Sequence, residues 1–178
     1  MKKAAIYLTL FISLFITSCS INDNTPDVNI TESDLIGDWK ITNVYTENGK
    51  VSLNANGTTV SGDYSATGKD YNINMSFTDS PKKVSTSGSI TIVATVTIAG
   101  QTQTQEESSG EIPNTTGEWS LKNNILTVKG TQETGELTIV KFENNSLVLK
   151  QALKASQSLG SLLNIKVTGE QYISLKKQ

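Results

Sequence analysis

The sequence predicts an all-β fold of antiparallel strands. From Gly37 onward the chain is rich in Thr, Val, Ile and Ser, the residue types that suit strands. Apolar and polar side chains alternate there, as they do in strands with one buried face. Asn and Gly recur at short intervals, where turns are expected. No long segment has a helical apolar period, so helices are not expected to build the fold.

The strands are predicted in chain order from the positions at which apolar residues alternate. Each group is expected to line the buried face of one strand or strand segment. The groups are Trp39, Ile41 and Tyr45; Tyr71, Ile73, Met75 and Phe77; Ile90, Ile92, Ala94, Val96 and Ile98; Trp119 and Leu121; Leu126 and Val128; Leu137 and Ile139; Leu147 and Leu149; Ile165 and Val167; and Ile173 and Leu175.

Two hairpin turns are predicted from paired asparagines. Asn123-Asn124 interrupts SLKNNILTV, and Asn144-Asn145 interrupts KFENNSLVL. Asparagine tolerates the left-handed backbone that tight hairpin turns require. The strands on either side of each turn are therefore expected to be antiparallel neighbours.

Three stretches are predicted to be irregular. Residues 20–33 are polar and are expected to form a flexible tether. Residues 100–116 are expected to form a polar loop or the extended tip of a hairpin. Residues 152–164 are predicted to be the one short helix, a connection or lid in which apolar side chains cover the core in preference to binding a ligand. Those side chains are Leu159, Leu162 and Leu163.

The N-terminal segment has the pattern of a secretory signal peptide. Lys2 and Lys3 are followed by an apolar run over residues 4–16, which is too short for a comfortable membrane span. Small residues then precede Cys19, the single cysteine of the chain. One cysteine cannot form an internal disulfide. An ordinary secretory signal with a chance cysteine at its end is the alternative.

Residues 16–19, Ile-Thr-Ser-Cys, resemble the lipobox of bacterial lipoproteins. The resemblance implies that Cys19 receives a diacylglycerol thioether and that cleavage occurs before it. Acyl chains such as palmitate would then hold the protein on a membrane, since each buried CH₂ contributes about 0.8 kcal/mol. Ser20, in place of an aspartate, favours the bacterial outer membrane, at its periplasmic face or at the cell surface.

The chain is expected to have three parts: a signal peptide over residues 1–18, a lipidated N-terminus and tether over 19–33, and one β-domain over 34–178. The whole chain has a formal net charge of −2, and removing the signal peptide takes away two lysines. The mature protein is therefore mildly acidic.

The composition argues against most enzyme classes and against several partners. The chain has no histidine and no arginine. A Ser-His-Asp triad, an imidazole metal ligand and a guanidinium that grips phosphate are therefore absent. Glu106 and Glu107, the one adjacent acidic pair, are expected to be solvated charges of a loop. We expect no enzyme activity, no metal, no cofactor and no nucleic-acid partner.

Three segments resemble the lipocalin-like domain of bacterial lipoproteins: DLIGDWKITNV, GEWSLKNNILTV and LTIVKFENNSLVL. Gly37-Asp38-Trp39 matches the Gly-x-Trp of the first lipocalin strand. The resemblance implies an up-and-down antiparallel β-barrel of about eight strands with room for one small ligand. A β-sandwich would show the same alternation and is the alternative fold.

In lipocalins the first-strand tryptophan plugs the barrel floor and an arginine packs over it. The resemblance therefore places Trp39 at the closed end, and Lys176 or Lys177 could supply the cation. Trp39 and Trp119 are both expected to be core residues that do not touch a ligand.

The leading functional expectation is a module that binds a small apolar or amphipathic molecule. The interior candidates are Tyr64, Tyr71, Met75 and Phe77, which combine bulk with a phenolic group. The same side chains could instead fill the barrel and leave no cavity. A structural or protein-interaction lipoprotein, which uses its outer surface or residues 100–116, is the alternative function.

The anchor can be tested with Cys19→Ala. The variant should remain unlipidated and should lose stable association with membranes, because no acyl chain can be attached to alanine. Fractionation of cell membranes measures this. A Cys19→Ala protein that still partitions fully with membranes would contradict the anchor.

Overall fold

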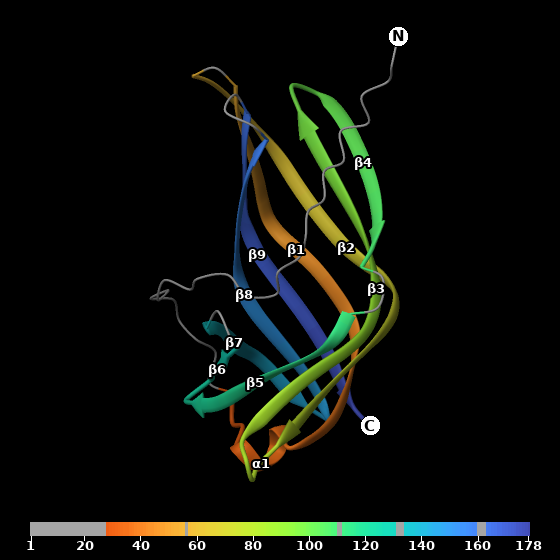
Figure 1. Cartoon of the computed structure of the whole chain (residues 1–178), viewed down its shortest axis with the longest axis vertical. Helices are drawn as coiled ribbons and strands as arrows, with labels where there is room; N and C mark the ends of the chain where they lie inside the picture. Colours follow the sequence, from red (N-terminus) through yellow and green to blue (C-terminus); the bar gives the residue numbers. More distant parts are fainter. Residues whose placement is uncertain (1–27, 56, 110–111, 131–133, 160–162) are drawn as a thin grey trace.

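The computed structural model describes residues 28–55, 57–109, 112–130, 134–159 and 163–178. The protein is all-β, and its strands form one antiparallel sheet of nine strands, as the alternation predicted (Figure 1). The elements are α1 (Glu32–Leu35), β1 (Gly37–Ala55), β2 (Thr58–Thr78), β3 (Lys83–Ile98), β4 (Gln101–Ser108), β5 (Ile112–Lys122), β6 (Ile125–Lys129), β7 (Thr134–Glu143), β8 (Ser146–Leu159) and β9 (Leu163–Lys177).

The hydrogen-bonded strands run around a barrel-like ring. The order is β2-β1-β9-β8-β7-β6-β5-β3-β4, and an additional pairing joins β2 to β3. The ring therefore consists of β1–β3 and β5–β9, and β4 is attached to β3 outside it. The first strand lies against the last, from Trp39 beside Lys177 to Ala55 beside Leu163. This closure distinguishes the ring from the alternative β-sandwich, which would have two separate sheets.

Among the described residues, strand pairing closes the ring in its lower half only. β3 pairs with β5 through Lys83–Gly88, but it pairs with β4 through Thr91–Ile98. On the other side, β7 reaches only as far as Lys150 of β8. We call the part of the ring near α1 the base. The upper half is the rest of the ring, on the far side of the β3–β5 and β7–β8 pairings from α1. It is built by β1–β4, β8 and β9.

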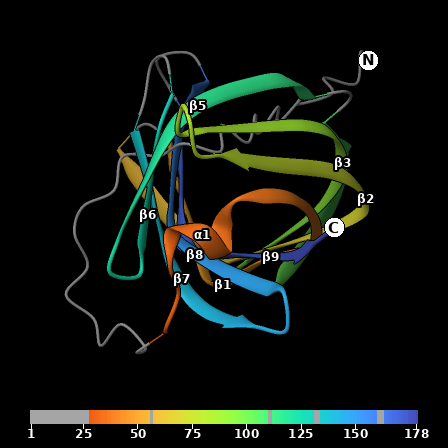
Figure 2. The same cartoon turned by 90° about the horizontal axis from the view of Figure 1, so that it is seen from below.

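Helix α1 closes the base. It lies across the middle of the ring when the molecule is viewed from below (Figure 2). Thr31 accepts the Asp34 N–H on its carbonyl oxygen (3.2 Å), and its own N–H and Oγ1 donate to Asp34 Oδ2 at 2.8 and 2.7 Å. Thr31 and Asp34 also form the capping box of this helix, which stabilises its single turn. Leu35, at the end of this turn, is fully buried.

Trp39 links α1 to the last strand. Its indole N–H donates to Leu35 O at 2.7 Å, and its ring is fully buried. The Nζ of Lys177 lies 5.4 Å from the ring centroid and donates to Asp34 O at 2.8 Å. The expected cation over Trp39 is therefore confirmed and belongs to Lys177. Lys176 instead donates to Asn144 O and Ser146 Oγ.

Trp119 repeats this arrangement on the other side of the base. Its indole N–H donates to Thr78 O at 2.9 Å, and Lys82 Nζ lies 5.4 Å from its ring centroid. The same lysine forms an ion pair with Glu32 of α1 at 2.6 Å. Each tryptophan thus satisfies its polar atom with a backbone carbonyl while its ring is buried.

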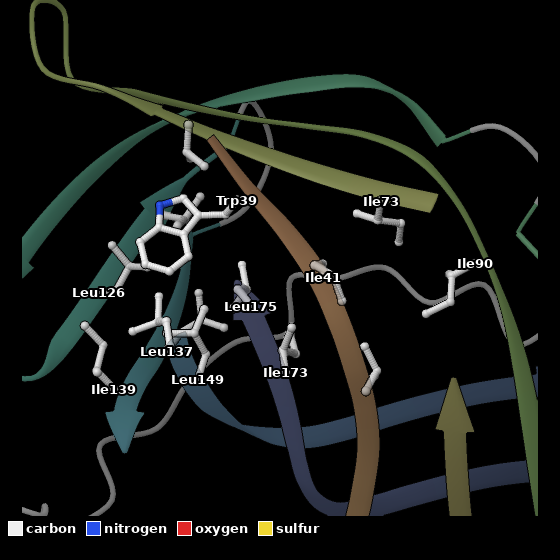
Figure 3. Packing of buried hydrophobic residues seen from close by; sticks show 14 of the residues in the cluster. Trp39, Ile41, Ile73, Ile90, Leu126, Leu137, Ile139, Leu149, Ile173 and Leu175 are labelled. Carbon is white, nitrogen blue, oxygen red and sulfur yellow. The ribbon is translucent and has the colours of Figure 1, made fainter. Parts of the chain in front are cut away.

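The most deeply buried side chains gather around Trp39 at the base (Figure 3). Their mutual packing supplies the hydrophobic stabilisation of the closed end. The large residues with less than 2 % relative exposure are Trp39, Phe77, Leu35, Leu126, Ile139, Leu147, Leu149 and Leu175.

Both predicted asparagine turns are present. Asn123, Asn144 and Asn145 have positive φ angles of 54°, 48° and 59°. They join β5 to β6 and β7 to β8, which are antiparallel neighbours. Of the two expectations for residues 100–116, the hairpin is correct, because β4 pairs with β3.

Two sequence-based predictions are wrong. Within the predicted helix 152–164, the described residues 152–159 and 163–164 are strand: β8 continues to Leu159, β9 begins at Leu163, and antiparallel pairing joins the two strands here. Tyr45 does not share a face with Trp39 and Ile41. A bulge between Ile41 and Asn43 shifts the alternation by one residue, so that Val44 is buried instead.

Other expectations concern residues at the edges of the described ranges. The signal peptide, Cys19 and residues 20–27 lie outside the described residues, as do Leu162 and the side chains of Leu159 and Leu163. α1 begins two residues before the predicted domain start at Asp34, and Val28 and Ile30 pack against the core.

Trp39→Ala should lower the free energy of unfolding by about 3–5 kcal/mol, because it leaves a cavity in the packed base and removes the bond to Leu35 O. Chemical denaturation of the two proteins measures the difference. A loss below about 1 kcal/mol would contradict the burial of this ring.

Candidate functional site

The four residues predicted to contact a ligand all lie on β2, but the strand spreads them along the height of the ring. Phe77 and Met75 are at the base, Tyr71 is at mid-height and Tyr64 is in the upper half. One small molecule cannot be surrounded by all four, since a strand rises about 3.3 Å per residue.

Phe77 and Met75 belong to the packed base. Phe77 is 1 % exposed, and its ring contacts the Trp119 ring edge to face, with centroids 5.7 Å apart. Met75 lies beside Trp39 in the register of β1 and β2 and packs against the core. Both side chains fill the interior next to α1.

Tyr71 joins two irregular points of neighbouring strands. The regular pairing of β1 with β2 is interrupted between Lys40 and Tyr45. Within that interval, the Val44 N–H donates to Tyr71 Oη at 3.0 Å, and the phenol donates to Gly68 O at 2.7 Å. The phenol thus satisfies backbone groups that the bulges would leave unpaired.

Tyr64 is the candidate that lies inside the upper half. Its side chain is 7 % exposed, and burial raises the pKa of its phenol. Its phenol makes no hydrogen bond to another described residue. Tyr64 is therefore a buried aromatic side chain whose polar atom is available to a partner.

Around Tyr64, the upper half presents an apolar inner face, which we call the upper interior. The pairings of β1, β2, β3, β8 and β9 place these side chains on one face of the sheet. The residues of the upper interior are Val51, Leu53, Tyr64, Ala66, Ile92, Ala94, Val96, Ile98, Leu153, Ala155, Ile165 and Val167.

The upper interior is less completely covered than the base. Leu147 and Leu149 of β8 are fully buried at the base, whereas Leu153 and Ala155 of the same inward row are half-buried. Along β3, Ile92 is buried but Ala94, Val96 and Ile98 are half-buried. Apolar surface therefore remains accessible inside the upper half.

Two glutamines separate the upper interior from the base. Gln171 follows the inward row of β9 and is 6 % exposed, and Gln151 lies beside it on β8. The Gln151 side-chain amide N–H donates to Gln171 Oε1. A buried amide needs such a partner, because desolvation without a hydrogen bond is costly.

Sequence reasoning missed these two glutamines, although the alternation contained a signal for them. Gln151 continues the row of Leu147 and Leu149, and Gln171 precedes Ile173 in the same phase. A polar residue at an apolar position of the alternation indicates either that the strand face reaches solvent there or that a polar group is buried. The pairing of β8 with β9 shows that a polar group is buried here.

The outer face behind these glutamines carries an aromatic stack. The rings of Tyr45 and Tyr172 are stacked with centroids 5.0 Å apart. Burial, and then the nearby Glu170 and Glu47 carboxylates, raise the pKa of Tyr172 to about 12. Lys150 forms an ion pair with Glu170 at 3.1 Å, so this outer patch is a network of charged and aromatic side chains.

Within the described residues, no group of three or more His, Cys, Asp or Glu side chains is placed to hold a metal ion. Glu106 and Glu107 lie on opposite faces of β4, and Glu106 forms an ion pair with Lys69 at 2.7 Å. No helix in the described ranges is long and apolar enough to span a membrane.

Comparison of the chain with protein-family models, with curated proteins and with solved structures finds no match. The geometry of the described residues therefore carries the functional argument.

The glutamine pair can be tested with a double-mutant cycle. Gln171→Leu should destabilise the protein by about 1–3 kcal/mol, because it leaves the Gln151 amide without its partner. Gln151→Leu combined with Gln171→Leu should recover most of that loss, since both polar groups are then gone. Denaturant unfolding of the four proteins gives the coupling energy, and additive losses would argue against a buried pair.

Proposed function

We propose that this chain is a lipid-anchored lipoprotein of the bacterial outer membrane, and that its barrel-like domain binds one small amphipathic molecule in the upper interior. The N-terminal pattern around Cys19 supports the anchor. The domain would act as a carrier or receptor for its ligand at the cell envelope.

The observation that carries the binding proposal is the contrast between the two halves of the ring. The base is filled by its own side chains, but the upper interior keeps half-buried apolar residues such as Val96 and Leu153 on its inner face. Ligand sites are concave and mostly apolar, with a few polar groups that orient the ligand. The apolar residues of the upper interior and its few polar side chains match the last two of these properties.

The polar groups at this place indicate an amphipathic ligand in preference to a pure hydrocarbon. Tyr64 offers a phenol, and Gln151 and Gln171 offer amide groups at the floor of the upper interior. Each amide keeps hydrogen-bonding capacity beyond the bond between them. A neutral hydroxyl, ester or amide group would match these side chains, because none of the three carries a charge.

The test uses two phenylalanine substitutions at adjacent positions of β3. Ala94 faces the upper interior beside Ala66, whereas Val93 faces outward beside Thr67. Ala94→Phe should displace the ligand by occupying its space, and Val93→Phe adds the same ring to the opposite face. The full-length proteins are extracted from their own membranes, and copurifying small molecules are measured by native mass spectrometry.

The wild type and Val93→Phe should carry the same small molecule, and Ala94→Phe should carry it at about one tenth of that occupancy or less. Equal unfolding midpoints for the two variants would show that the difference is not a folding defect. Wild-type protein without a small molecule, but with one captured protein partner, would contradict the proposal and favour the interaction lipoprotein.

A further inference from the structure

The outer edge of β4 is an unprotected sheet edge. β4 pairs with β3 along its whole length, and no strand among the described residues pairs with its other side. It lies at the upper right of Figure 1, beside β3. Proteins normally protect such edges with lysine, proline or a bulge. The sequence of β4, QTQTQEES, contains neither lysine nor proline, and its register with β3 is unbroken.

The free backbone groups of this edge can be assigned from the register. Ser109 N–H donates to Ile90 O at 2.9 Å, so these two residues form a hydrogen-bonded pair. In an antiparallel ladder such pairs alternate with pairs whose backbone groups point away from each other. The N–H and C=O groups of Thr102, Thr104 and Glu106 therefore point away from β3.

The side-chain contacts agree with this assignment. Thr104 Oγ1 lies 3.0 Å from Thr95 Oγ1, and Thr102 Oγ1 lies 3.0 Å from Thr97 Oγ1. Such close cross-strand contacts are typical of non-hydrogen-bonded pairs. The three outward-pointing residues present a regular row of donors and acceptors that a second extended strand can meet.

We propose that this edge pairs with the β4 edge of a second copy of the chain, antiparallel about a two-fold axis at Thr104. Thr104 then faces its own counterpart, and Thr102 faces Glu106 of the other copy. On the opposite face of the strand, Gln101 faces Glu107. The dimer extends the sheet continuously from one copy into the other.

Among the registers whose two-fold axis passes through one of the three outward-pointing residues, charge and strand length favour the axis at Thr104. A two-fold axis at Glu106 would place two glutamates directly opposite each other, which destabilises a strand pair. An axis at Thr102 would pair few residues, because β4 begins at Gln101. The axis at Thr104 pairs Gln101–Glu107 with no like charges opposite each other.

The second edge of the upper half, at β8, carries a lysine, which the β4 edge does not. β8 has no described neighbour on its β7 side beyond Lys150, but its residues there include Lys154. A lysine on an edge strand opposes pairing with a second copy of itself. β4 is therefore the edge that is suited to self-association.

The register can be tested by disulfide formation in full-length protein in its own membrane. In the proposed dimer the two Thr104 Cα atoms lie about 5.5 Å apart, a separation that a disulfide spans. Thr104→Cys should therefore give a disulfide-linked dimer on a non-reducing gel. The matched control is Thr102→Cys, which loses an equivalent Thr–Thr contact but lies about 13 Å from its counterpart along the strand.

Thr104→Cys should give at least about tenfold more disulfide-linked dimer than Thr102→Cys. It should exceed the wild type by the same factor, and the wild type measures any dimer formed through Cys19. Equal dimer from the two variants, or none from either, overturns the proposal. A linked band that contains a different protein, or a ladder of larger oligomers from pairing of β4 with β8, also overturns it.

Thr104→Pro provides an independent measurement without a new thiol. Proline removes the outward N–H of Thr104 and leaves the pairing with β3, because that N–H does not point to β3. Sedimentation of the full-length protein in detergent should show dimerisation weakened by about tenfold or more, with an unchanged unfolding midpoint. A Thr104→Pro protein that dimerises as the wild type does overturns the pairing.

Discussion

The structure depends on the seam where the last strand lies against the first. At its lower end Trp39 is held between α1 and Lys177: its N–H donates to Leu35 O, and the lysine ammonium lies over its ring. The same ammonium donates to Asp34 O. Helix, first strand and last strand therefore share one set of contacts. Because β9 is far from α1 and β1 in the chain, its association with them closes the ring and excludes water from the base.

Closure of the base leaves the upper half free to differ from it. β3 changes its neighbour from β5 to β4 along its length, so the upper half is a curved sheet whose edges, at β4 and β8, have no further partner among the described strands. Its inner face is apolar and partly accessible, and its floor is the Gln151–Gln171 pair. A packed end and a partly accessible apolar end are thus separated within one sheet.

The alternation predicted strands and their buried faces well, because burial of one face imposes a period of two. It failed where the backbone departs from that period. The bulge after Ile41 moves Tyr45 to the outer face, and no local pattern marks such an insertion. Residues 152–159 contain good helix formers such as Ala152 and Leu153, yet they are a strand. Pairing with β9 satisfies their backbone groups and outweighs local propensity.

The sequence by itself determined the all-β class, the asparagine turns and the residue types of the core, because these follow from local propensity and alternation. The tertiary structure alone decided which strands pair, that Lys177 covers Trp39, and that β4 has one neighbour among the described strands. It also decided that Gln171 faces inward and that the Tyr71 phenol forms hydrogen bonds with backbone groups. These outcomes depend on hydrogen bonds and packing between distant segments, and a local period carries no information about which distant strand will be the partner.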